Sequence, residues 1–231
     1  MKRLILLLFL VLTSLYSEAQ PTSDAGTWLT LTLQKPVTKR ITAVLDQELR
    51  LKENYQRINL FYTNLGFDYK YSNNIKISPT YRSIQKCRLD GSYSYRHRLM
   101  LDVTLKKKFE KITLSERVRY QAEVGDYLSS EKGKLVEQFL RLKTDLKLTS
   151  LNKISPYISC EVRYQIRDPK GKGPFSDYGF HRIRYVAGAE YQLQKNHSLN
   201  LYYLIQSEYY IADPETIYIL GIAYSITLQK K

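Results

Sequence analysis

From about residue 41 to its end, the chain repeats one pattern of hydrophobic and polar positions. About ten residues alternate between apolar and polar side chains, and a polar connection follows. Between Ile41 and Glu53, for example, Leu45 and Leu49 share one face while Asp46 lies on the other. Successive side chains leave a β-strand on opposite sides, so this period of two predicts strands. The polar positions are often charged and no helical segment covers either face, which is the pattern of strands between lipid and a polar lumen.

The alternation predicts eleven strands, each with an apolar outward face and a polar lumenal face. They span residues 27–34, 41–53, 57–71, 75–86, 93–106, 109–124, 135–148, 154–165, 180–193, 198–209 and 216–228. Short connections alternate with longer ones, as periplasmic turns alternate with external loops in outer-membrane barrels. Because single-chain bacterial barrels have even strand numbers, we expect either a twelfth strand or a first segment outside the ladder, leaving ten. The alternation of the first segment favours twelve. The expected fold is an all-β, transmembrane, antiparallel up-and-down β-barrel of ten to twelve strands.

The first residues have the features of a secretory signal peptide. Lys2 and Arg3 precede an apolar run over residues 4–12, and Ser17 and Ala19 are the small residues that a cleavage site requires. We therefore expect residues 1–19 to be a cleaved signal peptide and residues 20–231 to be a single outer-membrane β-barrel domain of a Gram-negative bacterium. No later stretch reaches the roughly 18 apolar residues of a transmembrane helix.

Charge and composition narrow the expected partners. The chain has a formal net charge of +14 at pH 7, which is common among nucleic-acid-binding proteins, but export and the lack of a nucleic-acid motif argue against that class. Outer-membrane lipid and lipopolysaccharide, together with small anionic solutes, suit the compartment better. The 21 tyrosines fit aromatic girdles at both membrane interfaces. We expect a monomer in which Cys87, in a loop, and Cys160, outward on a strand, are free thiols.

The main candidate site is a group of arginines on the predicted lumenal face. Aligning the strands by their connections places most of them in the outer half of the lumen. This predicted basic zone consists of Arg50, Arg82, Arg96, Arg98, Arg117, Arg119, Arg141, Arg163, Arg182 and Arg184. Its predicted acidic partners are Glu48, Glu123, Glu161 and Glu208, whereas Asp68, Asp102, Asp145 and Glu190 are expected lower in the lumen.

Two functions fit the basic zone. A guanidinium binds carboxylate or phosphate through two parallel hydrogen bonds, so the zone favours a narrow pore that prefers anionic solutes. Alternatively, Arg–Glu pairs fill and occlude the lumen of a structural barrel. The second function predicts balanced charge, yet ten arginines face four glutamates. Both functions therefore stay open.

Catalysis and metal binding have little support in the sequence. His97 is predicted to face outward, but no serine stands out as its partner and no G-x-S-x-G motif is present, which argues against a lipid-acting barrel enzyme and favours an interfacial ring. No metal-ligand spacing is found among His, Cys and acidic residues. We expect no enzymatic activity, cofactor or metal. A soluble β-sandwich would need outward faces more polar than Leu140 and Leu142 provide.

Six short segments along the chain carry a resemblance to a known family. They are Gly26-Thr27-Trp28, Gln47-Glu48-Leu49-Arg50, Ser78-Pro79-Thr80-Tyr81-Arg82, His97-Arg98-Leu99, Arg117-Val118-Arg119-Tyr120 and Ser155-Pro156-Tyr157-Ile158-Ser159-Cys160-Glu161. In this order they resemble domain-of-unknown-function family 2490, whose members are exported proteins of Gram-negative bacteria. The resemblance covers nearly the whole predicted mature chain. It implies an outer-membrane β-barrel and implies no activity.

Overall fold

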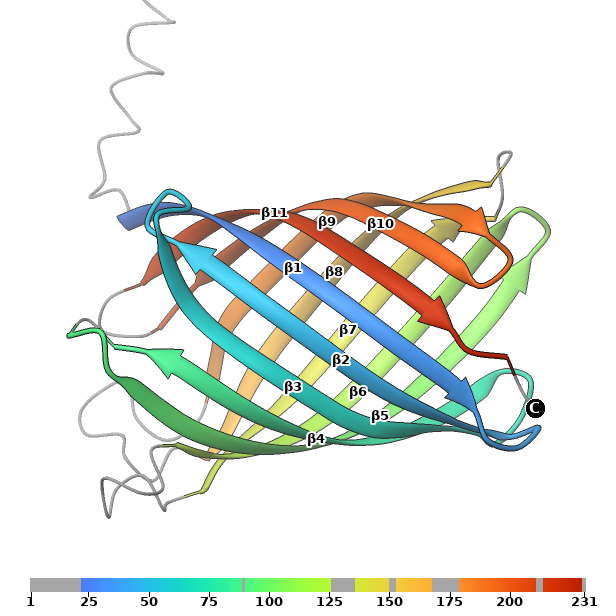
Figure 1. Ribbon diagram of the computed structural model, residues 1–231, viewed down its shortest axis with the longest axis horizontal. Helices are drawn as coiled ribbons and strands as arrows, with labels where there is room; N and C mark the ends of the chain where they lie inside the picture. Colours follow the sequence, from blue (N-terminus) through green and yellow to red (C-terminus); the bar gives the residue numbers. More distant parts are fainter. Residues whose placement is uncertain are drawn as a thin grey trace, which may run out of the picture.

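The computed structural model describes residues 22–88, 90–125, 136–149, 153–167, 179–210 and 214–229, and its strands close into one barrel (Figure 1). The strands are β1 (Thr22–Pro36), β2 (Ile41–Lys52), β3 (Arg57–Lys70), β4 (Ile75–Cys87), β5 (Tyr93–Phe109), β6 (Ile112–Gly125), β7 (Val136–Leu148), β8 (Ile154–Arg167), β9 (Gly179–Gln194), β10 (His197–Glu208) and β11 (Glu215–Thr227). The predicted all-β barrel of ten to twelve strands is confirmed. Within the described ranges no helix is long and apolar enough to cross a membrane.

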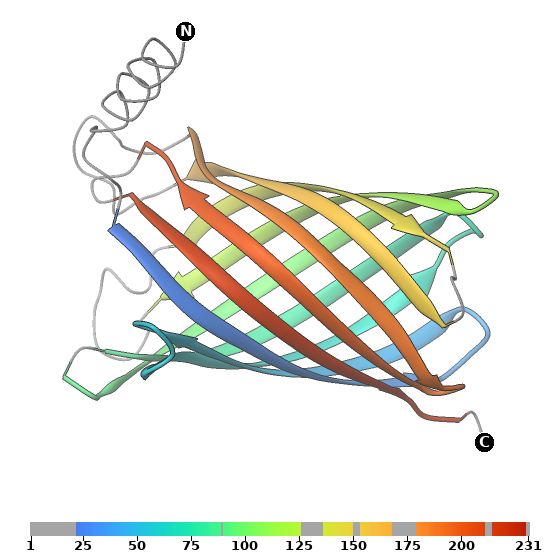
Figure 2. The same ribbon diagram turned by 90° about the horizontal axis from the view of Figure 1, so that it is seen from above.

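The barrel closes through a parallel pair of strands, β1 and β11 (Figure 2). Every other neighbouring pair is antiparallel and consecutive in sequence. In a ring of alternating strands, an odd number leaves two strands of like direction side by side, and the parallel pair accommodates them. The expectation of an even strand number is therefore wrong. The segment 27–34 belongs to the ladder within β1, and the described residues contain eleven strands, not twelve.

The connections define two ends of the barrel. The short-turn end carries the connections 37–40, 71–74, 110–111, 149–153 and 195–196. The long-loop end carries 53–56, 88–92, 126–135, 168–178 and 209–214. Of the predicted loops 125–134 and 166–179, residues 126–134 and 168–178 lie outside the described residues, as does the predicted signal peptide 1–19.

Two predicted connections differ from the structure in detail. The β5–β6 turn was expected at residues 107–108, but Phe109 pairs with Ile112 and the turn is made by residues 110–111. Glu110 adopts a left-handed φ of 38° there, a conformation that a two-residue hairpin turn needs. Cys87, expected in a loop, is instead the last residue of β4. Both cysteines are free thiols, as predicted.

The inner and outer faces of the barrel differ in polarity as the alternation predicted. Outward side chains are apolar and exposed, and Leu99 and Leu142 have exposed fractions of 63% and 50%. Inward side chains are largely polar and buried, and Gln121 is fully covered. A folded soluble protein buries most of its apolar strand faces. An exposed apolar outer wall around a polar lumen is instead the arrangement that contact with lipid requires.

One side of the lumen is apolar. Trp28, Leu204 and Ile219 form a buried cluster beneath β1, β10 and β11. The Tyr202 ring lies so close to Gly221 that a Cβ atom there would overlap it. Gly221 is therefore the residue that lets an aromatic ring lie flat against the wall next to the closing strand pair.

Candidate functional site

The structure places all ten arginines of the predicted basic zone on the lumenal face, where they line one cavity of about 740 Å³. Lys52, Lys86 and Lys143 line the cavity as well. The acidic lining residues are Asp46, Glu48, Glu123, Glu137, Glu161, Glu208 and Glu215. The strand alternation gathers these charges, because it turns every second side chain of eleven strands into one enclosed space.

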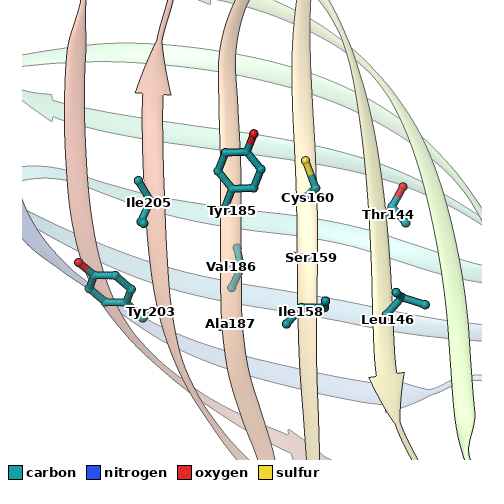
Figure 3. Close-up of a pocket in the computed structure, with 10 residues that line it drawn as sticks. All are labelled: Thr144, Leu146, Ile158, Ser159, Cys160, Tyr185, Val186, Ala187, Tyr203 and Ile205. Carbon is teal, nitrogen blue, oxygen red and sulfur yellow. The ribbon is translucent and has the colours of Figure 1, made fainter. Parts of the chain in front are cut away.

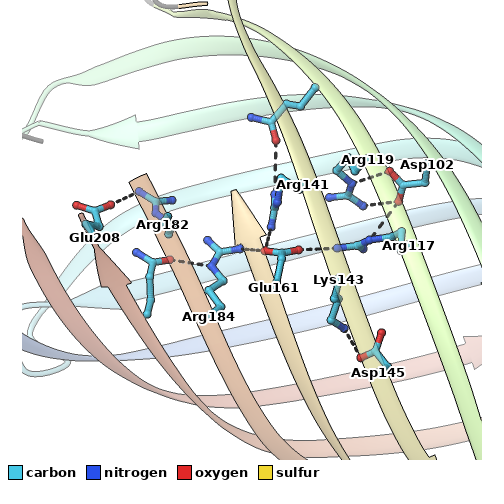
Figure 4. Close-up of polar contacts among 12 residues, drawn as sticks. Asp102, Arg117, Arg119, Arg141, Lys143, Asp145, Glu161, Arg182, Arg184 and Glu208 are labelled. Atoms are coloured by element: carbon cyan, nitrogen blue, oxygen red, sulfur yellow. Dashed lines mark hydrogen bonds and ion pairs between the residues drawn. The ribbon is translucent and has the colours of Figure 1, made fainter. Parts of the chain in front are cut away.

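Glu161 on β8 lies at the centre of the network (Figure 4). Its carboxylate accepts hydrogen bonds from Arg117 Nη2 at 2.6 Å, from Arg184 Nη1 at 3.1 Å and from Arg141 Nη2. These arginines come from β6, β9 and β7, so one carboxylate ties three strands to its own. Only 5% of Glu161 is exposed, which makes these ion pairs buried ones.

Asp102 belongs to this network, contrary to the prediction that it lies lower. Arg119 donates two hydrogen bonds to its carboxylate, at 2.6 and 2.7 Å, and Arg117 Nη1 lies 3.8 Å from Oδ2. The register pairs Asp102 with Arg119, so the two residues share one rung of the ladder. Because the strands are tilted, paired residues on successive strands lie at successively different heights along the barrel axis. The prediction counted residues from the strand ends and did not include this shift in height.

Two further carboxylates, those of Glu123 and Glu208, bind arginines nearer the long-loop end of the lumen. Glu123 accepts two hydrogen bonds from Arg98, at 2.5 and 2.9 Å, and one from Arg96 at 3.3 Å. Glu208 binds Arg182. The other acids that were expected lower pair locally instead: Asp68 with Lys76, Asp145 with Lys143, and Glu190 with Lys147.

Aromatic side chains hold the arginines of the opposite wall. The Arg50 guanidinium lies 3.5 Å from the Trp28 ring centroid and pairs with Glu48 at 2.5 Å. The Arg82 guanidinium lies 3.7 Å from the Tyr62 ring, and its Nε donates to Asn64. Guanidinium groups stack favourably on aromatic faces, so these rings replace part of the solvation that the arginines lose.

The ion pairs leave a surplus of positive charge. Eight of the ten arginines contact the five carboxylates of Glu48, Asp102, Glu123, Glu161 and Glu208. The remaining two, Arg82 and Arg163, contact no carboxylate among the residues that the structure describes. The lumen therefore keeps uncompensated positive charge after the ion pairs among the described residues are counted.

Sequence reasoning missed one buried lumenal residue, His181. A β-bulge between Arg163 and Tyr164 shifts the register so that both His181 and Arg182 turn inward. His181 then contacts the guanidinium of Arg163, with 3.1 Å between Nδ1 and Nη2. A bulge interrupts the period of two, and no sequence pattern marks a bulge as clearly as alternation marks a strand.

The outer wall carries a second cavity, an apolar groove of about 380 Å³ across β7–β10 (Figure 3). Ala187 forms its floor between Ile158 and Tyr203, its two neighbours in the register. Cys160 borders the groove as well. Thr144, which pairs with Cys160 in the register, donates a hydrogen bond to the Glu116 carboxylate. The groove contains no set of side chains suited to catalysis.

The outward His97 has a partner other than serine. Its Nδ1 lies 2.6 Å from the Tyr81 hydroxyl, and the two rings stack with 6.1 Å between centroids. Tyrosine–histidine pairs of this kind suit a membrane–water interface, where one end of each ring is wet. Across the described ranges no group of three or more potential metal ligands is found.

Comparisons with known proteins give a matching family model and a similar solved structure. A family model described as "Protein of unknown function (DUF2490)" matches residues 25–216. The crystal structure of the beta domain of the Bordetella autotransporter Brka is similar, with a TM-score of 0.46 and 12% sequence identity over 80% of each chain. No curated protein matches the chain.

Proposed function

The chain belongs to the DUF2490 family of proteins of unknown function, and we propose that it is a monomeric outer-membrane β-barrel with a narrow pore that prefers anions. The closed barrel leaves no unpaired strand edge, which is a condition for crossing a bilayer with strands. The apolar outer wall supports contact with lipid and lipopolysaccharide. The proposed role includes no catalysis.

Membrane embedding predicts opposite outcomes for two neighbouring residues of β7. Leu142 lies on the outer wall between Val118 and Val162, and Leu142→Arg should destabilise the barrel by about 2–4 kcal/mol if this position meets the bilayer midplane. Lys143 faces the lumen and pairs with Asp145 at 2.7 Å, so Lys143→Leu should cost no more than about 1 kcal/mol.

The measurement is urea-induced unfolding in vesicles, followed by the different gel migration of boiled and unboiled barrels. The wild-type chain should fractionate with outer membranes. Equal destabilisation by the two substitutions, or recovery of the wild type as a soluble periplasmic protein, would reject membrane embedding.

The observation that supports an anion-preferring pore is the surplus of basic side chains around one cavity. Ten arginines and three lysines line it, against seven acidic residues. Positive charge in a low-dielectric channel attracts anions and repels cations. A pore with this lining should therefore conduct anions better than cations.

A structural barrel with an occluded lumen is the second candidate, and the burial of the ion pairs favours it. Glu161 binds three arginines, and Gln121 beside the network has no exposed surface. In this case the arginines would stabilise the fold and not select a solute.

Planar-bilayer recording separates the two candidates. The wild type should give stepwise conductance, and a KCl gradient should give a reversal potential that indicates anion preference. The variant with Arg96, Arg98, Arg117 and Arg119 all changed to Gln should stay folded and lose that preference. The difference should be largest at low salt, because at 1 M salt the screening length falls to about 3 Å. A wild type without conductance steps, together with an unstable variant, would reject the pore.

A further inference from the structure

Four arginines stand side by side on the lumenal face of neighbouring strands. The register sets Arg119 of β6 beside Arg141 of β7, Arg141 beside Arg163 of β8, and Arg163 beside Arg182 of β9. Residues paired in this way have Cβ atoms about 4.5–5.5 Å apart, and like charges at that spacing destabilise a sheet. We call these four residues the arginine row.

Acidic residues that pair in register with the arginine row are found only at its two ends. Asp102 pairs with Arg119 at one end, and Glu208 pairs with Arg182 at the other. Each end carboxylate neutralises the arginine next to it. The middle of the row has no acid on its own rung.

Arg163, in the middle of the row, has only neutral contacts. Its guanidinium lies 4.6 Å from the Phe139 ring centroid, and its Nη2 donates to His181 Nδ1 at 3.1 Å. The two charged groups that act on it most strongly are Arg182 and Arg141, both of the same sign. Arg163 is half-buried in the wall of the lumen. A charge without a counter-ion in such a place is costly, so an anion bound from solution would stabilise it.

Hydrogen-bonding capacity is left over at the same place. The Nε atoms of Arg141, Arg163 and Arg182 are buried and have no partner among the described residues. All three side chains line the 740 Å³ lumenal cavity. His181 helps to orient Arg163 by accepting a hydrogen bond from its Nη2.

We propose that Arg141, Arg163 and Arg182 form a binding site for the phosphate group of a solute that enters the lumen. A tetrahedral phosphate presents several oxygens to several guanidinium forks at once, and each fork can bind two of them. Its double charge offsets Arg163 and part of its neighbours, which a single chloride does not. The site gives the proposed pore a class of solute, namely phosphate-bearing compounds. It rests on the proposed function in one respect, which is that a solute must be able to enter the lumen.

Calorimetric titration of the folded barrel in uncharged detergent tests the site without any measurement of conductance. Inorganic phosphate and glycerol 3-phosphate are added separately at constant ionic strength, which distinguishes a site for the free ion from one for a phosphate monoester. We expect saturable binding of one or both. Arg163→Gln should weaken it by about tenfold or more, the effect of losing charge-assisted hydrogen bonds.

The matched control is Arg40→Gln, which removes an exposed arginine from the short-turn end and should leave binding unchanged. Phosphate should also raise the unfolding midpoint of the wild type but not that of Arg163→Gln. Should that variant fail to fold, Arg163→Lys, which keeps the charge and loses the fork, should show the same loss of affinity. No binding to the wild type, or equal binding by the wild type and a folded Arg163 variant, would overturn the site. Phosphate binding without conductance would reject the pore and leave the site intact.

Discussion

Replacing Glu161 with Gln should lower the free energy of unfolding by about 3–5 kcal/mol, the cost of breaking a buried ion pair by removing one partner. The substitution keeps the shape of the side chain and removes its charge. Arg117, Arg141 and Arg184 would then lie close together without the carboxylate that binds all three. The size of the effect follows from this shared role, because one change leaves three guanidiniums with reduced counter-charge.

The control for Glu161→Gln is Glu190→Gln. Glu190 also pairs with a basic residue, Lys147, at 2.5 Å, but its side chain is 36% exposed. Exposed pairs contribute about 0–1 kcal/mol, so this variant should unfold close to the wild type. Urea unfolding followed by far-ultraviolet circular dichroism measures both. Similar losses for the two variants would contradict the central position of Glu161 in the network.

Replacing Trp28 with Ala should destabilise the barrel by about 3–5 kcal/mol, as truncation of a large core aromatic does. Trp28 lies in the buried cluster with Leu204 and Ile219, next to the β1–β11 closing pair. Its ring also faces the Arg50 guanidinium at 3.5 Å. The truncation thus opens a cavity and removes a cation–π contact at the pair of strands that closes the ring.

Two variants calibrate the Trp28 result. Trp28→Phe keeps an aromatic face for Arg50 and should lose less stability than Trp28→Ala. Leu31→Ala, on the outward face of the same strand, creates no internal cavity and should also cost less. The unfolding midpoint in urea compares the three variants. A loss for Leu31→Ala as large as for Trp28→Ala would indicate that the lumenal apolar cluster contributes little to closure.

The strands and their two faces were predictable because the period of two is local. Leu142 and Lys143 are adjacent in sequence, and their opposite environments follow from alternation alone. The strand parity was not predictable in the same way, because closure depends on how β1 meets β11, some 190 residues apart in the chain by the register of Thr22 with Glu215. The rule of even strand numbers was the only guide, and this barrel departs from it.

The sequence predicted which residues line the lumen, but it did not predict which of them pair with each other. Alternation turns Arg163 and Glu161 into the lumen whatever the register is. The partner of each arginine depends on the register between strands and on the shift in height between paired residues, so Asp102 was placed too low. The bulge that turns His181 inward and the ring of Phe139 under Arg163 arise from tertiary packing, which a single sequence does not encode as a local pattern.

The parallel closing pair has a consequence for the orientation of the chain. Since β1 and β11 run in the same direction, β1 begins at the long-loop end and β11 finishes at the short-turn end (Figure 1). In an even-stranded barrel the first strand begins and the last strand finishes on one side of the bilayer. In this barrel they do so at opposite ends. In the outer membrane that we propose for it, a peptide tag fused ahead of Thr22 and one fused after Thr227 would therefore report on two different compartments of the same cell.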